Sequence, residues 1–143
     1  TGIDHVAYRV RDLEASLRFY RDVLGFELLF IHDRDGAPWL HYFRVSDHTF
    51  LELFTGGEDP RDFDERSVGP MHLCLRTDDL DAALHRLAAR GLPVDGEPND
   101  GPLGNRNFWI EDPDGNNIEI VQQLPDNLIE QALARRQAPP TRA

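Results

Sequence analysis

The sequence predicts an α+β fold built from two βαβββ modules, and three observations support this prediction. A histidine is followed 47 positions later by a glutamate twice in the chain, at His5 and Glu52 and at His72 and Glu119. The second pair lies 67 positions after the first, since 72 − 5 = 67 and 119 − 52 = 67. The predicted order of strands and helices also restarts after a polar, turn-rich segment. A repeat in register indicates a duplicated structural unit.

The first module is predicted over residues 2–55. Its first strand, expected at residues 3–10, leads to Asp12, which can cap a helix that runs to about Leu24. Gly25 then ends that helix. The remaining strands are expected at residues 26–34, 37–46 and 49–55, the first two joined by the hairpin signal Asp35-Gly36.

A linker at residues 56–69 precedes the second module, which is predicted over residues 70–123. Residues 1–125 are expected to form one domain, followed at 126–143 by a C-terminal helix and a frayed tail. The second module repeats the pattern of the first, with strands expected at 70–77, 92–97, 105–111 and 117–123 and a helix at 79–90.

The alternation of side chains along the strands places both histidines and both glutamates on equivalent faces of the two modules, away from the aliphatic side chains. The opposite, aliphatic face is expected to be covered by the two helices. A carboxylate in the middle of an apolar strand is costly unless it is paired or binds a metal. We therefore predict that His5, Glu52, His72 and Glu119 bind one divalent cation. The alternative is that the two faces are independently exposed to solvent.

Composition excludes several classes of function. The formal net charge of −11 argues against nucleic acid and anionic membrane surfaces as partners. No apolar run approaches the roughly 18 residues that are needed to cross a bilayer. The single Cys74 excludes an internal disulfide, is compatible with a cytoplasmic location, and is expected to be a small buried residue. Lysine is absent, which excludes Schiff-base chemistry on a lysine.

Five segments, in this order and spacing, carry a resemblance to a known family: IDHVAYRV with His5, DLEASLRFYRDVLGFE, LELF with Glu52, MHLCL with His72, and EDPDGNNIEI with Glu119. Over about residues 2–123 the chain resembles the vicinal oxygen chelate superfamily of glyoxalases, bleomycin resistance proteins and extradiol dioxygenases. The resemblance implies paired βαβββ modules that curl into a half-barrel around a metal, with helices on the outer face. It also implies a homodimer, in which the site is completed either within one chain or across the dimer.

The resemblance places His5, Glu52, His72 and Glu119 at the four metal-binding positions of glyoxalase I. Retention of all four favours the glyoxalase and epimerase branches, which are lyases and isomerases. These enzymes act on a small carbonyl substrate through a metal-chelated enediolate, while a carboxylate moves the proton. Glu119 is favoured over Glu52 as that base. The ligand set suits Ni, Co, Zn, Fe or Mn, and the sequence does not choose among them.

Four further residues are candidates for contacts with the substrate. Arg9 stands where glyoxalase I has an arginine that contacts glutathione, and Arg106 is a candidate for binding an anionic group. Phe50 and Phe54 flank Glu52 and would form a dry wall around the metal.

Other positions bear on the substrate and on the wall of the site. Gly56, Val68 and the lysine-free loop NDGPLGNRN depart from glyoxalase I, which favours a small carbonyl substrate other than the hemithioacetal of glutathione. Either His41 or Tyr42, which alternate on one strand, is expected to face the site.

Two other functions remain open. An Fe(II) ring-cleaving dioxygenase of the same superfamily would use His5, His72 and Glu119 as ligands, with Glu52 unbound. A non-catalytic protein that binds a drug or metabolite would need no intact ligand set.

Overall fold

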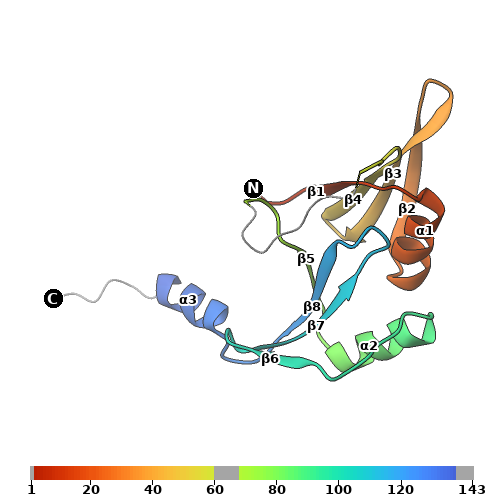
Figure 1. The fold of residues 1–143 in the computed structure, drawn as a ribbon. Coiled ribbons are helices and arrows are strands. Elements are labelled where there is room, and N and C mark those ends of the chain that lie inside the picture. The colour runs from red at the N-terminus through yellow and green to blue at the C-terminus, as the bar shows by residue number, and fades with distance from the viewer. Residues whose placement is uncertain (1, 60–67, 138–143) are drawn as a thin grey trace.

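A computed structural model describes residues 2–59 and 68–137 of the chain. It contains two separate four-stranded mixed sheets, ordered β1-β4-β3-β2 and β5-β8-β7-β6, which do not close into a barrel (Figure 1). The predicted α+β class and its pairing of two βαβββ modules are confirmed. Residues 60–67 of the predicted linker and the predicted tail at 138–143 lie outside the described residues.

Each module contributes one sheet and one helical segment. The first comprises β1 (His5–Arg9), α1 (Leu13–Leu17), a π-helical segment η1 (Arg18–Val23), β2 (Glu27–Arg34), β3 (Ala37–Ser46) and β4 (Thr49–Phe54). The second comprises β5 (Leu73–Arg76), α2 (Leu80–Ala89), β6 (Asn99–Gly101), β7 (Asn105–Glu111) and β8 (Asn117–Gln123), followed by α3 (Leu128–Gln137).

The repeat seen in the sequence is also a repeat of strand pairing. β1 runs parallel to β4 with Ala7 opposite Glu52, and β5 runs parallel to β8 with Cys74 opposite Glu119. Both positions are again 67 residues apart, since 74 − 7 = 67 and 119 − 52 = 67. The two sheets are therefore duplicated in register, residue by residue.

The first helix begins as predicted but does not continue as an α-helix to Leu24. Asp12 accepts a hydrogen bond of 3.0 Å from the backbone N–H of Ala15, which satisfies a donor of the first turn. The segment Arg18–Val23 is π-helical, with the Leu24 N–H bonded to the Phe19 carbonyl five residues earlier. This wider turn buries Phe19 together with its neighbour Tyr20.

The strand predicted at residues 92–97 is wrong, because β6 forms later, at Asn99–Gly101. Pro93 and Pro98 have no backbone N–H to donate to a neighbouring strand. Gly96 has a φ of 96°, which is outside the extended region. The apolar side chains of this segment pack against the core without strand pairing.

The aliphatic face of each sheet forms the core, as the alternation predicted. Leu51 and Leu53 of β4 and Ile118 and Ile120 of β8 are buried, whereas the residues between them are partly exposed. Both helical segments contribute to the same continuous cluster, through Tyr20 among others. Among the described residues, α1, η1 and α2 lie on the core side of the sheets, and the histidines and glutamates lie on the opposite face.

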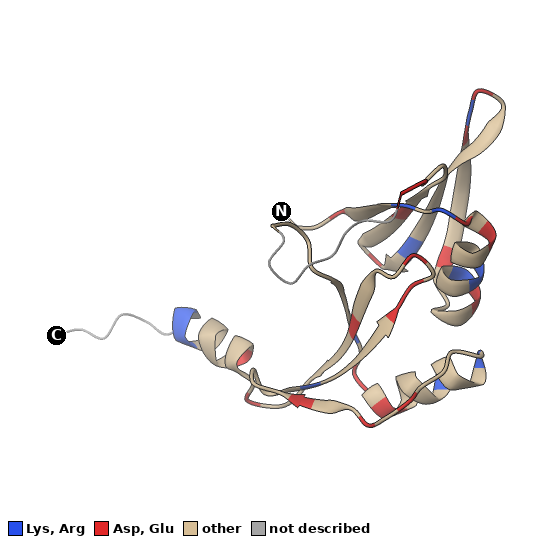
Figure 2. Cartoon of the chain, in the orientation of Figure 1, with Lys and Arg blue, Asp and Glu red and all other residues tan. Residues whose placement is uncertain are grey.

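Figure 2 shows acidic residues on strands and helices of both modules, with basic residues interspersed among them. Within residues 2–59 and 68–137, no helix combines the length and apolarity that spanning a bilayer requires.

Candidate functional site

The first candidate pair joins neighbouring parallel strands of the first sheet. His5 begins β1, Glu52 lies on β4, and the His5 Nε2 atom is 3.6 Å from a carboxylate oxygen of Glu52. The other ring nitrogen of His5, Nδ1, is hydrogen-bonded at 2.9 Å to the carboxylate of Asp4. This bond, followed by the charge of Glu52, raises the pKa of His5 above its ordinary value. Asp4 therefore orients the ring with Nε2 toward Glu52.

The second pair repeats this arrangement in the second sheet. His72 directly precedes β5, Glu119 lies on β8, and the distance from His72 Nε2 to a Glu119 oxygen is 3.4 Å. The Trp109 ring packs edge-on against the His72 ring, with centroids 4.8 Å apart. The side chains of His5 and His72 are 43% and 32% exposed, whereas those of Glu52 and Glu119 are only 16% and 15% exposed. Each imidazole is thus accessible above a shielded carboxylate.

The surroundings of the two glutamates correspond across the repeat. Tyr42 of β3 lies opposite Glu52, and Trp109 of β7 lies opposite Glu119. Each carboxylate therefore sits beside an aromatic residue at an equivalent position, since 109 − 42 = 67.

The structure brings each histidine to its glutamate but does not bring the two pairs together. Among the residues that the structure describes, no group of three or more His, Cys, Asp or Glu side chains is close enough to hold one metal ion. His72 lines a cavity of about 310 Å³ together with Ala7 and Tyr8 of β1. One chain therefore presents two half-sites, each with one imidazole and one carboxylate.

An aromatic face surrounds Glu52 on the exposed side of the first sheet. Phe30 stacks on Tyr42 with ring centroids 4.8 Å apart and planes 9° from parallel, and Tyr42 lies 5.4 Å from Phe50. The Trp39 and Phe54 rings meet at 4.7 Å. We call these five residues, Phe30, Trp39, Tyr42, Phe50 and Phe54, the aromatic face.

Arg9 belongs to the same side of the sheet as His5. Its guanidinium lies 5.9 Å from the centre of the Phe54 ring and donates a hydrogen bond of 2.9 Å to the Thr55 carbonyl. The predicted contact residues Arg9, Phe50 and Phe54 are thus gathered near Glu52, at the edge of the aromatic face.

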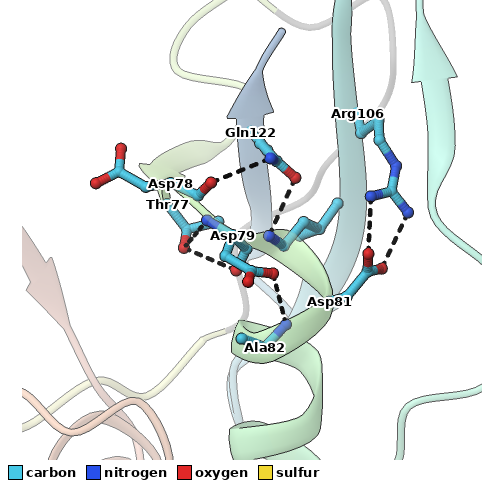
Figure 3. Close-up of polar contacts among 8 residues, drawn as sticks. Thr77, Asp78, Asp79, Asp81, Ala82, Arg106 and Gln122 are labelled. Atoms are coloured by element: carbon cyan, nitrogen blue, oxygen red, sulfur yellow. Dashed lines mark hydrogen bonds and ion pairs between the residues drawn. The ribbon is translucent and has the colours of Figure 1, made fainter.

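Arg106 is placed elsewhere. It alternates with Trp109 along β7 and shares the parity of the buried Phe108, so it points to the side covered by α2. There it makes two hydrogen bonds of 3.0 Å to the carboxylate of Asp81 (Figure 3). Arg106 therefore braces α2 against β7, and the surface that carries His72 and Glu119 does not include it.

Figure 3 also shows how the start of α2 is fixed beside β8. The Asp79 carboxylate accepts a hydrogen bond of 2.9 Å from the Ala82 N–H, as a helix cap does. Gln122 of β8 accepts from the Leu80 N–H at 3.2 Å and donates to the Asp78 carbonyl at 3.0 Å. These contacts hold the helix on the sheet face opposite Glu119.

Of the two alternating residues on β3, Tyr42 faces the candidate site. His41 is buried in the core with 2% of its surface exposed, and its Nδ1 atom has no hydrogen-bond partner among the residues that the structure describes. Burial lowers the pKa of His41 below its ordinary value, although the charges of Glu14 and Asp33 partly oppose this shift.

The prediction that Cys74 is a buried residue is wrong, because Cys74 is exposed. It lies two residues after His72 and opposite Glu119 in the pairing of β5 with β8. Partial desolvation, followed by the interaction with the Glu119 carboxylate, raises the pKa of its thiol to about 12. Strand alternation and the offset of 67 residues from Ala7 are the sequence signals that could have placed Cys74 beside Glu119.

Comparisons with known proteins agree with this architecture. The family model described as the Glyoxalase/Bleomycin resistance protein/Dioxygenase superfamily matches residues 2–120. A lactoylglutathione lyase from Pseudomonas putida is 30% identical, with 85% of each chain covered. A 2-epi-5-epi-valiolone epimerase from Actinomyces sp. is 31% identical, covering 84% of this chain and 78% of the epimerase.

Solved structures give the same result. TnmS3, an antibiotic binding protein from Streptomyces sp. CB03234, is 32% identical with a TM-score of 0.66, covering 87% of this chain and 97% of TnmS3. A lactoylglutathione lyase from Agrobacterium tumefaciens is 30% identical with a TM-score of 0.62, covering 85% of this chain and 93% of the lyase. With its two βαβββ modules and these matches, the chain belongs to the glyoxalase/bleomycin resistance protein/dioxygenase superfamily.

Proposed function

We propose that this protein is a metal-dependent lyase or isomerase of the glyoxalase type, acting on a small carbonyl substrate. The observation that carries the proposal is the His–Glu contact at equivalent positions of the two modules, at 3.6 Å for His5 and 3.4 Å for His72. Its relatives include lactoylglutathione lyases and an epimerase, matched over most of the chain.

The residues of the two half-sites suit a divalent cation. Two imidazole nitrogens and two carboxylates form a donor set that Ni, Co, Zn, Fe and Mn accept. Asp4 engages the other ring nitrogen of His5, as carboxylates commonly do for metal-bound histidines. Glu52 and Glu119 are largely shielded from water, and a cation would offset the cost of holding their charges there.

We further propose that two copies of the chain complete the site. The half-sites lie in different modules and face outward, and the described residues hold no group of three ligands within one chain. In a homodimer, His5 and Glu52 of one copy would face His72 and Glu119 of the other. A two-fold axis would generate two such sites, because each copy contributes both halves.

The residues of the proposed site would have different roles in the reaction. A cation bound here would act as a Lewis acid that polarises the carbonyl of the substrate. Glu119 would take a proton from the adjacent carbon and return it to the neighbouring position. Arg9 would bind a polar or anionic part of the substrate, while Phe50 and Phe54 would exclude water beside Glu52 and strengthen local electrostatic interactions.

The proposal is tested by mixing two ligand-deficient variants. One carries His5→Ala and Glu52→Ala, and the other carries His72→Ala and Glu119→Ala. Neither variant alone should bind Co²⁺ tightly, because each of its sites lacks two ligands. After joint refolding, half of the randomly paired dimers are mixed and each has one intact site of two, so about a quarter of the wild-type Co²⁺ binding should return.

The outcomes separate the parts of the proposal. If the mixture binds no Co²⁺ while the wild type does, the site forms within one chain and the cross-chain arrangement is wrong. If the wild type itself binds no divalent metal, the proposed metal-dependent function is wrong. Iron in the purified protein, with oxygen uptake on a catechol, would assign the Fe(II) ring-cleaving reaction instead.

The aromatic face favours a second candidate, a protein that binds a small molecule without catalysis. Phe30 stacks on Tyr42 at 4.8 Å, Tyr42 lies tilted against Phe50 at 5.4 Å, and all three rings are at least partly exposed to solvent. The similar TnmS3 is described as an antibiotic binding protein. The planar anion 8-anilinonaphthalene-1-sulfonate is a suitable probe, because Trp39 on this face reports its binding by fluorescence. Tight binding to metal-free protein, together with no metal binding by the wild type, would support this function.

A further inference from the structure

The outer strand of the first sheet presents an open edge. β2 ends the order β1-β4-β3-β2, so one of its two sides has no strand partner among the described residues (Figure 1). Its side chains from Leu29 to Arg34 are all exposed, and three consecutive apolar ones, Leu29, Phe30 and Ile31, are 43%, 51% and 47% exposed. A long apolar edge strand with unpaired backbone groups is a template for pairing with another strand.

A bulge in β2 decides which residues would meet in such a pairing. The register of β2 against β3 shifts at Leu29, which is an extra residue in β2. A second shift adds Trp39 to β3 and does not change the count along β2. Without the extra residue, Glu27 lies three pairing positions before Ile31, since 31 − 27 − 1 = 3, and Arg34 lies three positions after it, since 34 − 31 = 3.

The two residues equally distant from Ile31 carry opposite charges on the same side of the sheet. Glu27 forms an ion pair with Arg44 of β3, which lies opposite Phe50 on the side of the aromatic face. The guanidinium of Arg34 lies 4.8 Å from the centre of the Trp39 ring, which belongs to that face. The charges along the edge are therefore complementary to those of a second β2 that runs in the opposite direction.

We propose that β2 is an interface between two copies of this chain, which pair antiparallel about a two-fold axis at Ile31. Glu27 of each copy then lies opposite Arg34 of the other, and Phe30 lies opposite His32. Because both copies use the same surface, the contact is closed and joins two four-stranded sheets into one of eight strands. This interface goes beyond the proposed function and does not depend on the metal site.

The test is a set of charge reversals, with the molar mass measured by light scattering after size exclusion. Glu27→Arg and Arg34→Glu each place like charges opposite one another at both ends of the pairing, so each should halve the molar mass. The double variant restores opposite charges and should regain the wild-type mass. The two positions lie about 20 Å apart along one strand, so this recovery cannot arise within a chain. The double variant does not restore the ion pair with Arg44, which therefore cannot explain the recovery.

Cysteine cross-linking tests the register of the pairing. The background is Cys74→Ala, which removes the single cysteine of the chain. Under mild oxidation Ile31→Cys should form a disulfide between two copies, because the axis brings this position next to itself. Asp33→Cys is the matched control, because it is also exposed but lies two positions from the axis. Its two copies are offset by about 13 Å along the strands, which is too far for a disulfide.

Three results would overturn the inference: a monomeric wild type, single variants that keep the wild-type mass, or a double variant that does not regain it. Cross-linking of Asp33→Cys as readily as Ile31→Cys would overturn the register and with it the proposed axis. Co²⁺ binding by the wild type is measured in parallel. Its absence would remove the proposed metal-dependent function and leave the edge pairing standing, whereas unchanged masses would remove the edge pairing alone.

Discussion

The hydroxyl of Tyr20 in the first module donates a buried hydrogen bond of 2.6 Å to the carboxylate of Asp112 in the second. Asp112 also accepts from the backbone N–H groups of Asp114 and Asn116, at 2.9 and 2.8 Å. Desolvation, together with the charge and hydrogen bond of Asp112, raises the pKa of Tyr20, so the phenol remains a donor. The tight turn at Pro113 is thereby attached to the π-helical segment of the other module.

Tyr20→Phe should destabilise the protein without changing its fold. The variant removes one donor from a buried carboxylate that keeps its backbone donors, and we expect a loss of about 1–3 kcal/mol in the free energy of unfolding. Urea denaturation measures this value. Tyr42→Phe, on the exposed aromatic face, is the control and should change stability by much less. Equal stability of the wild type and Tyr20→Phe would show that the bond does not hold the modules together.

Glu119→Gln should retain part of the metal binding and lose proton transfer. The amide keeps an oxygen ligand but has no basicity, and removal of a general base costs about 10²- to 10⁴-fold in rate. Proton–deuterium exchange on an α-hydroxy ketone, followed by NMR, measures the step. Glu111→Gln, on an exposed residue of β7, is the control. Exchange at the wild-type rate in Glu119→Gln would exclude Glu119 as the base.

Arg9→Ala and Arg106→Ala should have different effects. Arg9 lies beside the aromatic face near Glu52, so its loss should raise KM for the substrate. Arg106 is engaged with Asp81 on the opposite side of the sheet, so its loss should leave KM unchanged. Because that ion pair is partly exposed, we expect only a small loss of stability. A raised KM in Arg106→Ala alone would reverse this assignment.

Stability should fall as the pH is lowered below the ordinary pKa of histidine, because of His41. Its pKa in the folded protein is lowered, so the unfolded chain binds a proton that the folded chain rejects. Stability is therefore full above about pH 6.5 and decreases as the pH falls from there toward the lowered pKa of the folded state. Thermal unfolding between pH 8 and pH 5 measures the effect, and His41→Leu should flatten the slope in this range. The raised pKa of the exposed His5 acts in the opposite direction.

The sequence anticipated most of the elements, because their signals are local. The strands at residues 37–46, 105–111 and 117–123 have the predicted limits, and Asp12 caps the first helix. The prediction of a strand at residues 92–97 was wrong. Apolar residues there indicated a strand, but Pro93 and Gly96 prevent strand pairing. The sequence did not predict the π-helical segment. Its wider turn depends on core packing around Tyr20 and not on a local sequence signal.

By itself, the sequence determined the duplication and the side of each sheet on which His5, Glu52, His72 and Glu119 lie. Both follow from the fixed offset of 67 and from the two-residue period of a strand. Only the tertiary structure decided the distances. It joined each histidine to its own glutamate, kept the two half-sites apart, paired Arg106 with Asp81 of α2 and set Cys74 opposite Glu119. The physical reason is that a strand's periodicity fixes which face a side chain takes, whereas the separation of two faces depends on how distant segments pack against one another.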